Sequence, residues 1–260
     1  MKFKKNIKIC VAAGHGKSKN GGFDPGACSG CFREFDIAKE TAKYLSQYLR
    51  SAGFDTELIN YNGDLYLTER VEKINSGDFD FALEIHLNAG GGTGSEVYYP
   101  KGSAQGRRAA ALISSGIAEA FSIPDRGAKT KDGRNSRDYF AVVRDTKPLT
   151  LLVETLFIDS DDVENVSSAS GRDLCARAIS KAVLAFFSEK AAPFTVKILC
   201  DELNVRDGPG TRHKINMTVR RGDVFTVVEK NENWGRLKSG AGWINLSNNL
   251  VEMRETENEL

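Results

Sequence analysis

The stretch CVAAGHGKSKNGGFDPGACSGCFREFDIAKE, from Cys10 to Glu40, decides the fold of this chain. It begins in an apolar run typical of a buried strand, continues through a glycine-rich loop, and ends in an amphipathic helix. In α/β proteins such a loop lies at the carboxyl edge of a sheet, where ligands bind. The loop holds His15 between two glycines, and Glu34 opens the helix. Both side chains are therefore candidates for a functional site.

The same alternation of strand and helix continues to about residue 187. Apolar runs predict strands at 7–13, 55–59, 79–89, 95–100, 139–143 and 149–157. Apolar residues at helical spacing predict helices at 35–52, 67–76, 102–121 and 172–187. This order predicts an α/β fold, a twisted and mostly parallel sheet flanked by helices.

The pattern changes beyond residue 194, where short alternating runs are separated by Gly, Asn and Asp. The runs are too close together for crossover helices, so they predict a small all-β module. We expect a first domain over 1–190, a linker over 191–195, the all-β module over 196–253 and a flexible tail over 254–260.

Composition excludes several functions. The chain has 36 Lys and Arg against 35 Asp and Glu, a net charge of +1, so we expect no nucleic-acid or membrane partner. No apolar run approaches the roughly 18 residues of a membrane span. The apolar run after the basic N-terminus is too short for a signal peptide, so we expect synthesis and folding in the cytoplasm.

Five cysteines at scattered positions argue against a disulfide framework. Cys28 and Cys31 form a CxxC pair, but a zinc ribbon would need a second pair. Two reduced loop cysteines are the simpler interpretation, and a redox switch or a local disulfide stays open.

Four groups are expected at one sheet edge, because His15 follows a strand, Glu34 begins the next helix, and His86 and Glu154 lie at or near the ends of strands. Two imidazoles and one carboxylate are a ligand set of catalytic zinc, and a second carboxylate can take a proton from water. Each residue has a plainer interpretation. Either histidine could be structural, and Glu34 could stabilise a helix N-terminus. Glu154 is harder to dismiss, because a carboxylate is costly to bury in the run LTLLVETLF.

These residues occur in motifs that resemble those of the zinc-dependent N-acetylmuramoyl-L-alanine amidases of the AmiC-like type. The resemblance covers about residues 7–188 in order and spacing, through the motifs AGHG, DPGA, LTERV, EIHLNAG and LLVETLFIDSDDVENV. It implies one catalytic Zn²⁺ held by His15, Glu34 and His86. It also implies Glu154 as the general base that helps zinc-activated water to hydrolyse the bond between N-acetylmuramic acid and L-alanine.

One residue departs from the family pattern. The position two before the second histidine is often serine in the family, and here it is Glu84. In a strand, Glu84 and His86 point to the same face, so Glu84 could orient a metal ligand or act as a rival base. A paired structural carboxylate is the alternative. Arg70, in LTERV, is interpreted as structural.

The all-β module resembles a bacterial SH3 domain through LNVRDGPG and NWGRLKSGAGWINL. The resemblance implies an SH3-like barrel that binds cell-wall peptide. The candidate wall-binding residues are Asn204, Arg206, Trp234 and Trp243. The tryptophans could equally serve in packing.

We therefore expect a peptidoglycan hydrolase of the endolysin type, held in the host cytoplasm until its release to the cell wall. The alternatives are a host autolysin or mother-cell-lytic amidase, a zinc peptidase that cuts the stem peptide, and a non-catalytic wall-binding protein. The sequence does not distinguish a monomer from a dimer.

Overall fold

The computed structural model describes residues 7–188, 193–231 and 233–254. The chain forms two compact units, Met1–Phe187 and Ser188–Leu260. Most of the expected linker and the expected tail beyond residue 254 lie outside the described residues. No helix among the described residues is long and apolar enough to cross a membrane.

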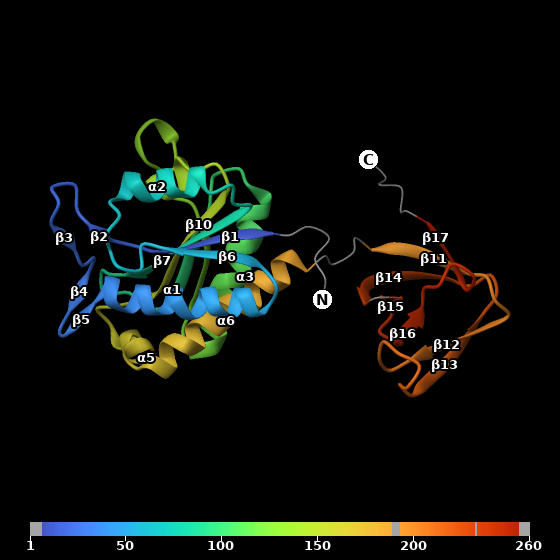
Figure 1. Ribbon diagram of the computed structural model, residues 1–260. Helices are drawn as coiled ribbons and strands as arrows, with labels where there is room; N and C mark the ends of the chain where they lie inside the picture. The colour runs from blue at the N-terminus through green and yellow to red at the C-terminus, as the bar shows by residue number, and fades with distance from the viewer. Residues whose placement is uncertain (1–6, 189–192, 232, 255–260) are drawn as a thin grey trace. The chain divides into compact units, whose positions relative to one another are not determined.

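A six-stranded sheet forms the centre of the first unit (Figure 1). Every neighbouring pair is parallel except β10 with β8, which confirms the prediction of a mostly parallel sheet. The strand order is β6 (Asp55–Ile59), β1 (Lys8–Ala13), β7 (Phe81–Asn88), β10 (Leu149–Phe157), β8 (Ser95–Tyr98) and β9 (Asp125–Lys129).

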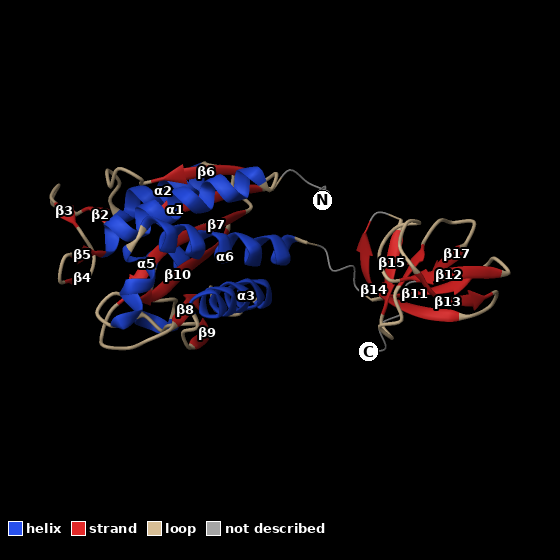
Figure 2. Cartoon of the chain, turned by 90° about the horizontal axis from the view of Figure 1, so that it is seen from below, coloured by secondary structure: helices blue, strands red, loops and turns tan. Residues whose placement is uncertain are grey.

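Helices cover both faces of this sheet. One face carries α1 (Glu34–Ser51), α3 (Ala104–Phe121) and α6 (Ala169–Phe187), with α6 between the other two (Figure 2). The opposite face carries α2 (Leu67–Ser76) and the single turn α4 (Ala141–Arg144). Three short helical segments lie in loops: η1 (Arg134–Ser136), η2 (Asp161–Val163) and α5 (Glu164–Ser167).

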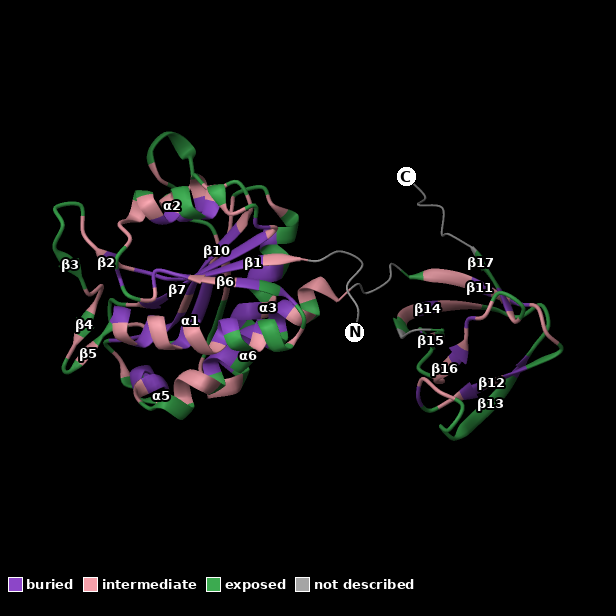
Figure 3. Cartoon of the chain, viewed as in Figure 1, coloured by how far each residue is buried: buried purple, intermediate pink, exposed green. Residues whose placement is uncertain are grey.

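The central strands of the sheet are mostly buried (Figure 3), and strand alternation divides their side chains between two cores. On β7, Leu83 and Ile85 pack in the core of α1, α3 and α6, whereas Ala82 packs with α2 and α4. Burying a large aliphatic side chain contributes about 1.5–3 kcal/mol, so the register of this strand is strongly fixed. Because side chains alternate, Glu84 and His86 point to the face that α2 covers.

The predicted strand at 139–143 is wrong. Its second half is the helical turn α4, in which Arg144 N donates to Phe140 O and Asp145 N donates to Ala141 O. Val142 and Val143 are both buried in the same core, which a helical turn permits but an alternating strand does not. The strand β9 was not predicted, because DRGAK has no apolar alternation.

The second unit is a seven-stranded, fully antiparallel sheet around its own apolar core, consistent with an SH3-like module. Two of its strands, β13 and β17, were not predicted. The first strand begins at Phe194, inside the range expected to be a linker. The strands are β11 (Phe194–Ile198), β12 (Glu202–Arg206), β13 (Ile215–Arg220), β14 (Val224–Asn231), β15 (Trp234–Leu237), β16 (Trp243–Asn245) and β17 (Val251–Arg254).

Candidate active site

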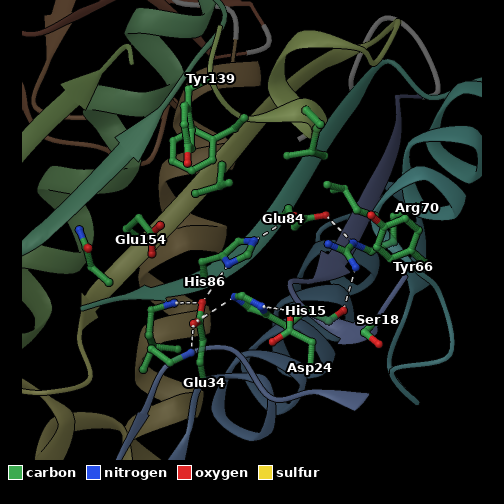
Figure 4. Close-up of a pocket in the computed structure, with 18 of the residues that line it drawn as sticks. His15, Ser18, Asp24, Glu34, Tyr66, Arg70, Glu84, His86, Tyr139 and Glu154 are labelled. Atoms are coloured by element: carbon green, nitrogen blue, oxygen red, sulfur yellow. Dashed lines mark hydrogen bonds and ion pairs between the residues drawn. The ribbon is translucent and has the colours of Figure 1, made fainter. Parts of the chain in front are cut away.

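Three elements bring two imidazoles and a carboxylate together at the carboxyl edge of the sheet (Figure 4). His15 follows β1, His86 lies near the end of β7, and Glu34 is the first residue of α1. Each residue offers one ligand atom, and these atoms lie within 4.8 Å of one another. The group could hold a metal ion, and it joins three of the four residues expected at this edge.

Glu34 lies at the centre of this group and is buried. Its Oε1 lies 2.9 Å from His86 Nδ1 and accepts a hydrogen bond from Leu87 N. Its Oε2 lies 3.1 Å from His15 Nε2 and accepts a hydrogen bond from Ala27 N. Burial raises the pKa of this carboxyl, but hydrogen bonds to the two histidines outweigh burial and hold the pKa well below its usual range. Glu34 is therefore a carboxylate.

The second nitrogen of each imidazole is held by another carboxylate. His15 Nδ1 lies 2.9 Å from Asp24 Oδ2, and His86 Nε2 lies 2.9 Å from Glu84 Oε1. Each ring therefore directs its remaining nitrogen toward Glu34, an arrangement typical of metal-ligating histidines. Sequence reasoning assigned no role to Asp24, although it lies in the quoted motif DPGA.

The surroundings of His86 favour a positive charge. Burial lowers the pKa of its imidazole, but hydrogen bonds to Glu34 and Glu84 outweigh burial and raise the pKa to about 10. Burial likewise raises the pKa of Glu84, whereas the charge of Arg70 and the hydrogen bond to His86 lower it to about 2. The site thus surrounds two imidazoles with carboxylates that stay ionised.

Two glycines make room for this arrangement. At Gly14 a Cβ atom would overlap the imidazole of His86. At Gly26, where φ is +72°, a Cβ atom would lie 2.5 Å from Glu34 Oε2 and 2.7 Å from His15 Cδ2. Any larger residue at either position must displace a member of the group.

Arg70 reaches the site from α2. Its Nε donates to Glu84 Oε2 at 3.0 Å, and its Nη1 donates to the backbone carbonyl of His15 at 2.8 Å. Both partners of the Arg70–Glu84 ion pair are buried. Glu84 thus lies between Arg70 and His86, on the face of β7 that it shares with His86.

Glu154 lies beside the metal-ligand group, because its register partner on β7 is His86. Its Oε2 is buried and has no hydrogen-bond partner among the described residues. Burial is the main cause that raises the pKa of this carboxyl to about 7. The neighbouring histidines lower the pKa, and the neighbouring carboxylates raise it. A carboxyl with such a pKa can accept and release a proton near neutral pH.

A cavity of about 900 Å³ opens over these groups. It is lined by His15, Glu34, His86 and Glu154, so all four expected residues face one space. Its walls come from the loop after β1, from the start of α2 and from the segment around α4, and include Lys17, Tyr66, Arg70, Tyr139 and Arg144.

Cys28 and Cys31 lie in the hairpin of β4 (Cys28–Ser29) and β5 (Phe32–Arg33), just before Glu34. Both are exposed free thiols. The other small hairpin of this loop joins β2 (Gly16–Lys17) to β3 (Phe23–Asp24).

The four candidate wall-binding residues share one face of the second sheet. Arg206 pairs with Trp243, which pairs in turn with Arg236. Asn204 and Trp234 lie two residues from Arg206 and Arg236 on the same strands, so strand alternation gives them the same face. All four are half-buried, whereas the residues between them are buried in the core.

The fold and the site define a two-part protein, an α/β domain with a candidate metal site at its sheet edge and an SH3-like module. Residues 9–185 match the model of the N-acetylmuramoyl-L-alanine amidase family, and residues 200–248 match that of the bacterial SH3 domain. The chain belongs to the N-acetylmuramoyl-L-alanine amidase family and is a peptidoglycan hydrolase.

Individual relatives agree with this assignment. The amidase CwlM of Bacillus licheniformis is 31% identical over 212 residues, which are 76% of this chain and 79% of CwlM. The endolysin of Bacillus phage SPP1 is 31% identical over 163 residues, 59% of this chain and 56% of the endolysin. The structure of Cwp6 from Clostridium difficile matches with a TM-score of 0.65 and 29% identity, over 70% of this chain and 29% of Cwp6.

Proposed function

We propose that His15, Glu34 and His86 hold one catalytic zinc ion. Three features support this proposal. The donor set of two imidazoles and one carboxylate leaves a fourth position open, as in catalytic zinc sites. Three ionised carboxylates, Asp24, Glu34 and Glu84, surround the two imidazoles, and of these three Glu84 pairs with the guanidinium of Arg70, so the site favours a bound cation. The glycines at positions 14 and 26 leave space beside the ligands.

A zinc ion in this position would polarise the scissile carbonyl and lower the pKa of a water molecule. Glu154 then takes the proton from the attacking water and passes it to the leaving amine of L-alanine. Its unpartnered Oε2 in the cavity and its pKa of about 7 support this role, because one group must act first as a base and then as an acid.

We further propose that the chain acts as an endolysin, for which the likeness to the phage SPP1 endolysin is the support. A bacterial lytic amidase with the same chemistry is the second candidate, because the match to CwlM covers more of both chains. Residence in the host cytoplasm before release is a prediction of the sequence alone.

The SH3-like module would bring the enzyme to its polymeric substrate. We propose that the face formed by Asn204, Arg206, Trp234 and Trp243 binds the wall peptide, since half-buried aromatic and polar side chains together suit a short peptide.

The test is the product. Purified cell walls treated with the enzyme should gain L-alanine amino groups without new reducing sugars, chelation should abolish the reaction, and zinc should restore it. New amino groups on other residues of the stem peptide would indicate a peptidase, and no product at all would indicate a wall-binding protein. A chelator-resistant reaction would exclude the zinc mechanism.

A further inference from the structure

The ion pair of Arg70 and Glu84 is connected to the imidazole of His86 and to the backbone of His15 (Figure 4). On one side, Glu84 Oε1 lies 2.9 Å from His86 Nε2. On the other side, Arg70 Nη1 donates to the carbonyl oxygen of His15 at 2.8 Å. The guanidinium of Arg70 thus contacts the carboxylate that binds His86 and the backbone carbonyl of His15.

The contact with His15 acts on a strained backbone. His15 has a φ of +62°, in the left-handed region that residues other than glycine adopt uncommonly. Its carbonyl accepts hydrogen bonds from both Arg70 Nη1 and Asn60 Nδ2. These two bonds hold the turn that directs His15 Nε2 toward Glu34.

The contact with His86 acts on the ring itself. Glu84 as an acceptor holds the proton of His86 on Nε2, so Nδ1, which lies 2.9 Å from Glu34 Oε1, is the nitrogen that can release its proton and bind a metal. Arg70 in turn fixes the carboxylate of Glu84, because its Nε donates to the other oxygen. Without Arg70, Oε2 of the buried Glu84 would lose its guanidinium partner.

We propose that Arg70 and Glu84 form a positioning pair that presents both imidazoles to the metal, and that Arg70 is a determinant of metal affinity rather than only a structural residue. This inference rests on the proposed zinc site. Glu84 acts through His86, and Arg70 acts through Glu84 and the His15 carbonyl.

The molecule offers a matched control, the ion pair of Arg126 and Glu96. These side chains lie 2.7 Å apart in the same unit, and Glu96 is buried like Glu84. Among the described residues, neither side chain hydrogen-bonds to His15, Glu34 or His86, and Glu96 bonds to Asn88, Tyr98 and Arg126. Breaking this pair should cost stability without changing metal affinity.

The experiment measures zinc dissociation constants of the full chain by chelator competition, for wild type, E84Q, R70K, R70M/E84Q, E96Q and R126K. In E84Q the amide oxygen can still accept a hydrogen bond from His86, but an uncharged amide replaces the carboxylate that pairs with Arg70. R70M/E84Q removes both charges together. We expect the affinity to fall about 10- to 100-fold in E84Q and R70M/E84Q, and less in R70K, as for other residues that orient metal ligands. E96Q and R126K should bind zinc like wild type.

A spectroscopic readout separates positioning from general destabilisation. The cobalt-loaded protein should show exchangeable imidazole N–H resonances, and E84Q should shift the one that belongs to His86. Urea unfolding of the metal-free variants measures stability separately. If R70M/E84Q does not fold, the near-isosteric E84Q decides the comparison.

The outcomes are distinct. Wild-type chain that binds no zinc would remove the proposed function and this inference together. Wild-type chain that binds one zinc, with E84Q and R70K indistinguishable from E96Q and R126K in affinity and in the His86 resonance, would overturn the positioning pair alone.

Discussion

Glu154 is half-buried, its Oε2 is buried without a hydrogen-bond partner among the described residues, and its pKa is raised to about 7, a combination unusual for a carboxyl group in an apolar strand. We expect E154Q to reduce turnover by about 100- to 10,000-fold, because the variant loses proton transfer. Zinc content should stay that of wild type, since the residue is not a proposed ligand.

Release of L-alanine amino groups from cell walls measures turnover, and mass spectrometry measures bound zinc. The control is E119Q, at an exposed position on α3 outside the cavity. Full turnover in E154Q would remove Glu154 from the mechanism.

Gly14 permits the position of the His86 ring, since a Cβ atom there would overlap the imidazole. We expect G14A to weaken zinc binding, because the ring must move away from Glu34. G116A, on α3, is the matched control: its Cβ atom would meet only ordinary contacts with α6, the nearest at 3.4 Å. Equal zinc affinity in G14A and wild type would show that the ring position does not matter for the metal.

Among the strands, Glu96 on β8 connects three neighbours. It accepts hydrogen bonds from Asn88 on β7, from Tyr98 and from Arg126 on β9. Burial raises the pKa of Glu96, but the bonds from Arg126 and Tyr98 outweigh burial and lower it. Ionised Glu96 therefore stabilises the folded state fully above its unfolded pKa of about 4.3. This stabilisation is lost as the pH falls through the lower pKa of the folded state.

This sign gives a prediction for E96Q. At pH 7 the variant should unfold with a free energy about 1.5–3 kcal/mol lower than that of wild type, the usual range for hydrogen bonds to a charged group. The difference should shrink in acid, where wild type also loses the charge. Urea unfolding of wild type and E96Q at pH 7 and in acid measures the difference in unfolding free energy. An equal difference under both conditions would contradict the role given to ionised Glu96.

The elements also show how far the sequence predicts the fold. Long periodic segments such as α1, α3, β7 and β10 were predicted because apolar spacing alone determines them. The strand β9 and the turn α4 were not predicted correctly, because tertiary pairing and packing decide short segments. β13 was missed for a related reason, since its first four residues are exposed and carry no buried alternation.

The site shows the same division. Motif order predicted that His15, Glu34, His86 and Glu154 would share one sheet edge, and one cavity contains all four. The partners of these residues could not be derived from spacing. Asp24 reaches His15 from a loop, and Arg70 reaches Glu84 from the helix α2, so both contacts depend on the folded chain.

At the scale of the whole chain, the two compact units predict separable functions. A chain that ends at Lys190 should fold and should cleave soluble muropeptides like the full chain. It should sediment less with purified cell walls, because it lacks the SH3-like module. The full-length variant W234A/W243A should lose the same wall binding if the proposed face carries it. A first unit that cannot fold alone would contradict the domain division.

The central claim is that two histidines and Glu34 hold one catalytic zinc ion. Zinc titration of the full chain and of H15A/H86A, followed by calorimetry, tests it most directly. The account predicts one tightly bound zinc per wild-type chain and no such binding in the double variant, with loss of amidase activity. Zinc bound with unchanged stoichiometry and affinity in H15A/H86A would contradict it.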